Sequence, residues 1–111
     1  MMVYVDDMQA GYGRMKMCHM IADTDDELHA MADRIGVARK WHQKPGTAKS
    51  HYDIALNKRA LAVAAGAVEI TWRQTGRMVR RREITGSLGD PTTAIEWKEP
   101  RNQVRSAAQE A

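Results

Sequence analysis

Short apolar runs near the N-terminus have the pattern of strands. Residues 2–5 are apolar, aromatic or β-branched and end at two aspartates, so they predict a strand. Residues 8–14 contain two glycines and predict a loop, because glycine weakens both helices and strands. Residues 15–21 predict a second strand. The chain is therefore expected to begin with two strands joined by a loop.

A helix is predicted immediately after these strands. Thr24 and Glu27 form a capping box, in which each side chain can bond the backbone amide of the other residue. Apolar residues then recur at helical spacing from Leu28 to Ile35, and Gly36 supplies a left-handed stop. The pattern therefore predicts one amphipathic helix.

A strand, a second helix and a further strand are predicted after this helix. Residues 37–41 predict a short strand, and Asn57 is placed to cap a second helix that runs through Ala65 and stops at Gly66. Residues 67–72 alternate like a strand. The resulting order is β-β-α-β-α-β, which favours layered α/β packing over a helical bundle.

Residues 73–84 fit two structures. They form either a basic hairpin, with a return strand over residues 78–84, or a basic helix. We expect a single small α/β domain over residues 1–85, with about four short strands and two helices. A C-terminal arm or tail is expected over residues 86–111, where a second copy of the chain could hold it in a homo-oligomer.

Composition limits the classes of protein that are compatible with the chain. The 111 residues are 43% hydrophobic and 28% charged, which fits one globular domain and excludes wholesale disorder. No apolar run approaches the length of a membrane span, and no signal peptide is expected. Cys18 is the only cysteine, so an internal disulfide is impossible and a cytoplasmic location is expected, in the host if the protein is phage-encoded.

Charge is distributed unevenly along the chain. Acids outnumber bases by five in residues 1–33, whereas bases outnumber acids by eight in residues 34–111. This asymmetry favours an anionic ligand, a nucleic acid or a partner chain that contacts one half.

Polar residues gather in a few short segments around the predicted strands and helices. Groups at strand ends converge in many α/β proteins, so these residues are the candidate ligand-binding set. The set comprises Asp6, Asp7, His19, Asp23, His29, His51, Tyr52, Asp53, Lys58 and Arg59. In the structural alternative, the two N-terminal aspartates only end a strand and His29 only pairs with Asp33 on a helix face.

Four blocks in this region resemble a known family. They are VYVDD at residues 3–7, CHMIAD at residues 18–23, ELH at residues 27–29 and HYD at residues 51–53. The chain resembles, over about residues 1–71, an uncharacterised family of small bacterial and phage proteins, a domain of unknown function. The resemblance implies no activity. It implies that the characteristic polar positions of that family are Asp6, His19, Asp23, His29, His51, Asp53 and Arg59.

Three functions are compatible with these residues. The favoured hypothesis is a non-catalytic pocket for a phosphorylated, nucleotide-like ligand, which could sequester a signalling nucleotide. Its phosphate donors would be His19, His29, His51 and Arg59, and its acceptors for ribose or base would be Asp6, Asp23 and Asp53.

The second hypothesis is a metal-dependent phosphoester hydrolase. A divalent transition metal would be held by Asp6, His19, Asp23 and His51. His19 and Asp53 would be the catalytic residues, with His29 as another candidate base or orienting group.

The third hypothesis is nucleic-acid binding through the arginine-rich segment 73–82. Phosphate contacts would come from Arg73, Arg77, Arg80, Arg81 and Arg82, with Trp72 stacking on a base. The structural alternative, an edge strand whose charges prevent aggregation, is favoured over it.

Overall fold

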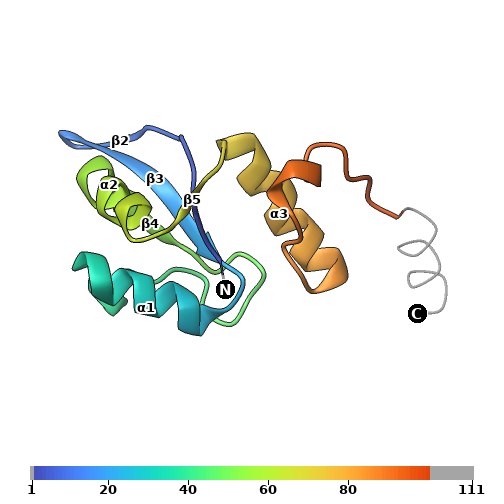
Figure 1. Cartoon of the computed structure of the whole chain (residues 1–111), viewed down its shortest axis with the longest axis horizontal. Coiled ribbons are helices and arrows are strands. Elements are labelled where there is room, and N and C mark those ends of the chain that lie inside the picture. The colour runs from blue at the N-terminus through green and yellow to red at the C-terminus, as the bar shows by residue number, and fades with distance from the viewer. Residues whose placement is uncertain (1, 101–111) are drawn as a thin grey trace.

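The computed structural model describes residues 2–100 and has a mixed five-stranded sheet with three α-helices (Figure 1). The expected α/β class is therefore confirmed. The strands are β1 (Val3–Val5), β2 (Ala10–Tyr12), β3 (Met15–Ala22), β4 (Tyr52–Ala55) and β5 (Val68–Glu69). The α-helices are α1 (Asp25–Ile35), α2 (Leu56–Ala64) and α3 (Trp72–Thr85), and the 3₁₀ helices are η1 (Arg39–Trp41) and η2 (Pro91–Thr93).

The long strand β3 organises the sheet. Antiparallel pairing joins β1 to its C-terminal part and β2 to its N-terminal part, while β4 pairs antiparallel along the opposite edge. The ladder continues past β1, because the Asp6 amide donates to the His19 carbonyl oxygen at 3.0 Å. In β4, Asp53 lies directly opposite His19. Side chains that are distant in sequence are thus brought to the middle of β3.

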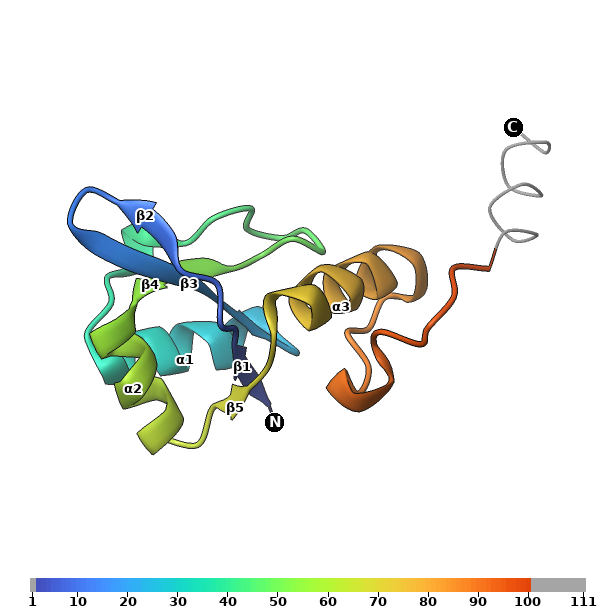
Figure 2. The same ribbon diagram turned by 90° about the horizontal axis from the view of Figure 1, so that it is seen from above.

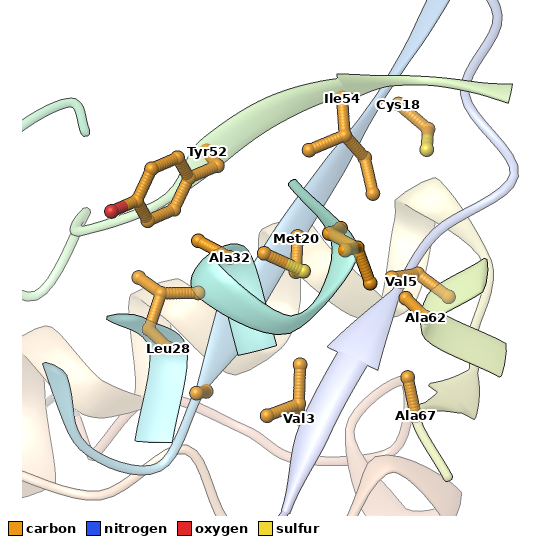
Figure 3. Close-up of a cluster of buried hydrophobic side chains, with 12 residues drawn as sticks. Val3, Val5, Cys18, Met20, Leu28, Ala32, Tyr52, Ile54, Ala62 and Ala67 are labelled. Carbon is orange, nitrogen blue, oxygen red and sulfur yellow. The ribbon is translucent and has the colours of Figure 1, made fainter. Parts of the chain in front are cut away.

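The two faces of β3 pack against different helices. Cys18 and Met20 point into the core formed with α1 and α2, which Figure 3 shows together with Leu28 and Tyr52. Ile21 points to the other face, where it packs in a cluster that includes Met78 of α3. Because side chains alternate along a strand, His19 shares this second face with Ile21. Figures 1 and 2 show α1 and α2 together on one side, with α3 lying apart from them.

Helix α1 forms where its sequence predicts it, with half of the predicted capping box, since the Glu27 carboxylate accepts from the Thr24 hydroxyl and not from its backbone amide. The Thr24 hydroxyl accepts from the Glu27 amide, and Gly36 ends the helix with φ of 78°. The second helix starts differently from the prediction, because Asn57 does not cap it. Its N-cap is Ala55, and the Asn57 side chain accepts from the neighbouring Lys58 amide.

The predicted strand over residues 37–41 is wrong. Residues 39–41 form η1 instead, and Arg39 makes an ion pair with Asp33 at 2.9 Å that holds this turn beside α1. The fourth strand of the sheet is β4, in a segment where no strand was predicted. Its alternating buried and half-buried residues satisfy the period of a strand.

The loop predicted over residues 8–14 contains strand β2. Pairing of Tyr12 with Met15 leaves two residues in the turn, and Gly13 has φ of 61° there. The glycine therefore permits a tight hairpin, for which positive φ is required. The strand predicted over residues 67–72 is shorter than expected, because α3 begins at Trp72 with Thr71 and Gln74 as a capping box.

The basic segment is a helix, so the hairpin alternative is wrong. Its arginines hold the chain to itself: buried Arg81 donates to the carbonyl oxygens of Leu88 and Asp90, both at 2.7 Å. Arg77 donates to the Trp97 carbonyl oxygen, and Arg80 pairs with Glu99. Among the five arginines proposed for nucleic acid, Arg73 and Arg80 are classed as exposed. Binding of nucleic acid stays a prediction. Four of the five arginines that would contact phosphates already bond to groups of the chain itself.

Residues 86–93 return along α3, and residues 94–100 then turn back in the direction of the helix (Figure 2), with Leu88 and Ala94 buried beside it. Residues 101–111 of the expected arm lie outside the described residues, so the homo-oligomer and the division at residue 85 stay predictions. Within residues 2–100, no helix combines the length and the apolar character needed to cross a membrane.

Arg82 joins α3 to the sheet and to the loop before β4. Its guanidinium donates to the carbonyl oxygens of Ala22 at 2.7 Å and Ala48 at 2.8 Å. We expect Arg82→Ala to lower the free energy of unfolding by about 2–4 kcal/mol, because part-buried acceptors lose a charged donor. Urea denaturation measures the change. The exposed Arg73→Ala control should stay within about 0.5 kcal/mol of the parent, and equal stability of the two variants would contradict this account.

Candidate metal centre

A buried carboxylate fixes the His19 ring. Asp6 follows β1 directly and is fully buried, with Oδ2 at 2.8 Å from His19 Nδ1. Its other oxygen, Oδ1, accepts from the backbone amides of His19 at 2.9 Å and Met8 at 3.2 Å. Arg59 of α2 donates to the Asp6 backbone oxygen at 2.7 Å. Every polar group of Asp6 thus has a partner, as a buried charge requires.

The Asp6–His19 contact lowers the pKa of Asp6 and raises the pKa of His19. Burial alone would raise the pKa of Asp6, but the hydrogen bonds from the His19 side chain and backbone outweigh it and lower that pKa. The hydrogen bond to Asp6 raises the pKa of His19, against the lowering by burial. An ionised Asp6 needs a donor, so the hydrogen of a neutral His19 ring resides on Nδ1. The Nε2 lone pair is then free to bind a ligand.

His51 and Asp53 complete a group of three ligand atoms. His51 precedes β4, and its Nδ1 donates to the Lys49 carbonyl oxygen at 2.6 Å. Asp53 Oδ1 lies 3.5 Å from His51 Nε2 and 3.8 Å from His19 Nε2. The three residues offer ligand atoms that all lie within 4.8 Å of one another. They are spaced closely enough to share one ion.

The second polar atom of each member is already engaged. Asp6 holds Nδ1 of His19, the Lys49 carbonyl holds Nδ1 of His51, and Gln43 Nε2 donates to Asp53 Oδ2 at 2.7 Å. Imidazoles that bind metals usually donate their other nitrogen to a carboxylate or a carbonyl, which fixes the tautomer and the ring orientation. This arrangement leaves Nε2 of both histidines and Oδ1 of Asp53 close to one another and outside these contacts. The donor set suits zinc or another divalent transition metal.

Two pockets meet at this centre. A pocket of about 640 Å³ is lined by His19 and Asp53 together with Lys58, Tyr12 and Trp41. A second pocket of about 430 Å³ is lined by His19 and His51 and carries Lys49, Trp72 and Glu83. A ligand at the centre therefore has room on both sides.

Several predicted site residues lie elsewhere. Asp23 is exposed past the end of β3, where Tyr4 donates to it at 3.5 Å, and it is not part of the three-residue group. Asp7 accepts from the first amide of α3, that of Trp72, at 2.7 Å. Arg59 pairs with Glu69 at 2.9 Å in addition to its contact with Asp6. Asp6 contacts the imidazole of His19 and is also outside the three-residue group.

His29 and Tyr52 belong to a separate polar cluster between α1 and the loop before β4. His29 Nδ1 is 2.7 Å from the Tyr52 hydroxyl. His42 Nε2 is 2.7 Å from the Ser50 hydroxyl, which donates to Asp25 at 2.6 Å. Burial and the neighbouring His29 lower the pKa of His42, whereas the hydrogen bond from Ser50 lowers that of Asp25.

The sequence analysis missed Gln43 and the Lys49 carbonyl. Gln43 reaches the centre because it forms an isolated β-bridge with His51, a pairing that no local pattern encodes. Cys18, next to His19 in sequence, points into the opposite core. Cys18 is 1% exposed, and burial raises its pKa to about 11, which favours the thiol over the reactive thiolate.

Comparison with known proteins supports the resemblance noted in the sequence. No curated protein and no solved structure matches the chain. Residues 3–82 match the family described as "Protein of unknown function (DUF4031)", and this range includes all four sequence blocks and the complete centre. The chain therefore belongs to the DUF4031 family, whose function is unknown.

Proposed function

We propose that the protein is a metal-dependent hydrolase of phosphoesters, with a divalent transition-metal ion held by His19, His51 and Asp53. The observation that carries the proposal is the spacing of the three ligand atoms, which lie within 4.8 Å of one another. Each ligand has its other polar atom held by a neighbour, which leaves the close atom to bind an ion. Three protein ligands leave a coordination position open, which is typical of catalytic zinc sites and not of structural ones.

An ion at this position would lower the pKa of a bound water and so supply a nucleophile near neutral pH. In the hydrolysis, the water oxygen forms a bond to phosphorus while the ester P–O bond breaks. One water proton ends on the leaving oxygen, and the other stays on the new phosphate or passes to solvent. Lys49 and Lys58 each line one of the two pockets, and their charges suit an anionic phosphoester on either side.

In this proposal, Asp53 changes its role from candidate base to metal ligand, and Asp6 orients His19 from outside the ligand group. The alternative is the non-catalytic pocket for a phosphorylated, nucleotide-like ligand. The size of the larger pocket favours it, because about 640 Å³ is within the usual range for small-molecule sites. The two functions share the same residues and differ in turnover.

Metal binding is the first test. Isothermal titration of the metal-free protein with Zn²⁺ should give one ion per chain, and His51→Ala should show no measurable binding because only two ligands remain. The matched control is His29→Gln, since His29 lies in the separate cluster with Tyr52. Equal Zn²⁺ affinity in the parent and in His51→Ala would contradict the site.

The Asp6 carboxylate should affect affinity through the His19 ring. We expect Asp6→Asn to weaken Zn²⁺ binding by about 10–100-fold, since loss of such outer partners loosens the ligand they orient. The exposed Asp23→Asn variant should bind as the parent does. Circular dichroism of both variants shows whether they are folded. Unchanged affinity in a folded Asp6→Asn protein would contradict the orienting role.

Turnover separates the hydrolase from the non-catalytic pocket. The Zn²⁺- or Mn²⁺-loaded protein should release 4-nitrophenolate from bis(4-nitrophenyl) phosphate, and a chelator should abolish the rate until metal is restored. His51→Ala should lose the activity, whereas His29→Gln should keep it. A rate that is the same in His51→Ala and the parent, or no rate with the metal bound, would exclude this hydrolysis.

A further inference from the structure

Two aromatic side chains in the larger pocket are exposed without a role in the core. Tyr12 of β2 is 68% exposed, and Trp41 at the end of η1 is 58% exposed. Both line the pocket that reaches His19 and Asp53. They come from segments that are distant in sequence, one from the β2–β3 hairpin and the other from the segment after α1. Exposed aromatic residues that gather in a hollow are typical of a ligand-binding surface.

The larger pocket is lined by aromatic, thioether and polar side chains. The lining combines these aromatic rings and the thioethers of Met8, Met15 and Met17 with Lys58 and with His19 and Asp53 of the metal centre, whereas His51 lines the second pocket. Met15 is also 48% exposed, so its thioether is accessible to a ligand. A ligand that fits would carry a phosphoryl group at the polar part and a flat, weakly polar ring at the aromatic part.

We propose that this pocket binds the base of a nucleoside phosphoester, which stacks on Trp41 and Tyr12 while its phosphoryl group lies at His19, His51 and Asp53. This inference rests on the proposed function for the position of the phosphoryl group. Bases of every kind have a π-face, so aromatic stacking selects nucleotides as a class without selecting one base. The pocket of about 640 Å³ has the volume for such a ligand.

The Lys40 ammonium lies 5.2 Å from the centroid of the Trp41 ring, a cation–π contact that stabilises the ring without burying it. Lys58 adds a cation to the lining of the pocket, close to Gly36. The pocket therefore combines stacking surfaces with positive charge, the two features that nucleotide-binding grooves share.

Binding by a matched pair of ligands tests the base directly. Adenosine 5′-monophosphate and ribose 5-phosphate share the sugar and phosphate, and only the first has a base. Titration calorimetry with the Zn²⁺-loaded protein should give roughly tenfold tighter binding of the nucleotide. Trp41→Ala should remove most of that difference while it leaves the affinity for ribose 5-phosphate and the Zn²⁺ stoichiometry unchanged. Trp41→Phe should retain it, and the exposed Leu61→Ala on α2 is the control for loss of apolar surface.

The outcomes separate the two proposals. Equal affinity for both ligands, or a nucleotide preference that survives in Trp41→Ala with Tyr12→Ala, would overturn the stacking pocket even if bis(4-nitrophenyl) phosphate is hydrolysed. A nucleotide preference that depends on Trp41, in a protein that hydrolyses no ester, would support the stacking pocket and exclude the hydrolase. Binding of the nucleotide to metal-free protein as tightly as to the loaded protein would overturn the placement of its phosphate.

Discussion

The contact between the Asp6 carboxylate and the His19 imidazole is the constraint on which the site depends. It buries an ionised group, which is costly unless every oxygen is bonded, and here two backbone amides and one imidazole supply those bonds. The same residue holds Arg59 through its backbone oxygen, so it also links β1 to α2. The outcome is a histidine whose orientation and tautomer are set by the fold before any ligand arrives. A flexible imidazole would have to lose rotamer freedom on binding, and this one has already lost it.

The position of His19 in the sheet determines its exposure to a ligand. Helices α1 and α2 cover one face of the sheet, whereas α3 covers only part of the other (Figures 1 and 2). His19 lies on the second face at the boundary of the covered part, with its side chain 33% exposed. Because β4 pairs with β3 in a register that places Asp53 opposite His19, the centre forms at this boundary. The two pockets on either side follow from the same incomplete coverage.

Local signals in the sequence were sufficient for some elements and not for others. Capping and periodicity predicted α1 correctly, because both depend on residues within a few positions. The capping box of Thr71 and Gln74 was an equally local signal for α3 that went unused. Strand β4 was missed because two of its four residues, Asp53 and Ala55, are of types that are uncommon in strands, so that its pairing with β3 is the main signal for it. Gly13 does lie in a turn, as predicted, but residues 10–12 of the predicted loop form β2, because they pair with β3 in a tight hairpin.

The structure brings together only part of the predicted polar set. His19, His51 and Asp53 do converge, but Asp23 and His29 do not, since neither belongs to the group around β3 and β4. Spacing along the chain cannot say which face of the sheet a residue takes when the register is unknown.

The central claim, that three side chains hold a single ion, has a direct test in anomalous diffraction at the zinc edge from crystals grown with one equivalent of Zn²⁺. The account predicts one peak at about 2.0–2.2 Å from Nε2 of both histidines and a carboxylate oxygen of Asp53. A peak at another set of side chains, or no peak at this centre, would contradict it.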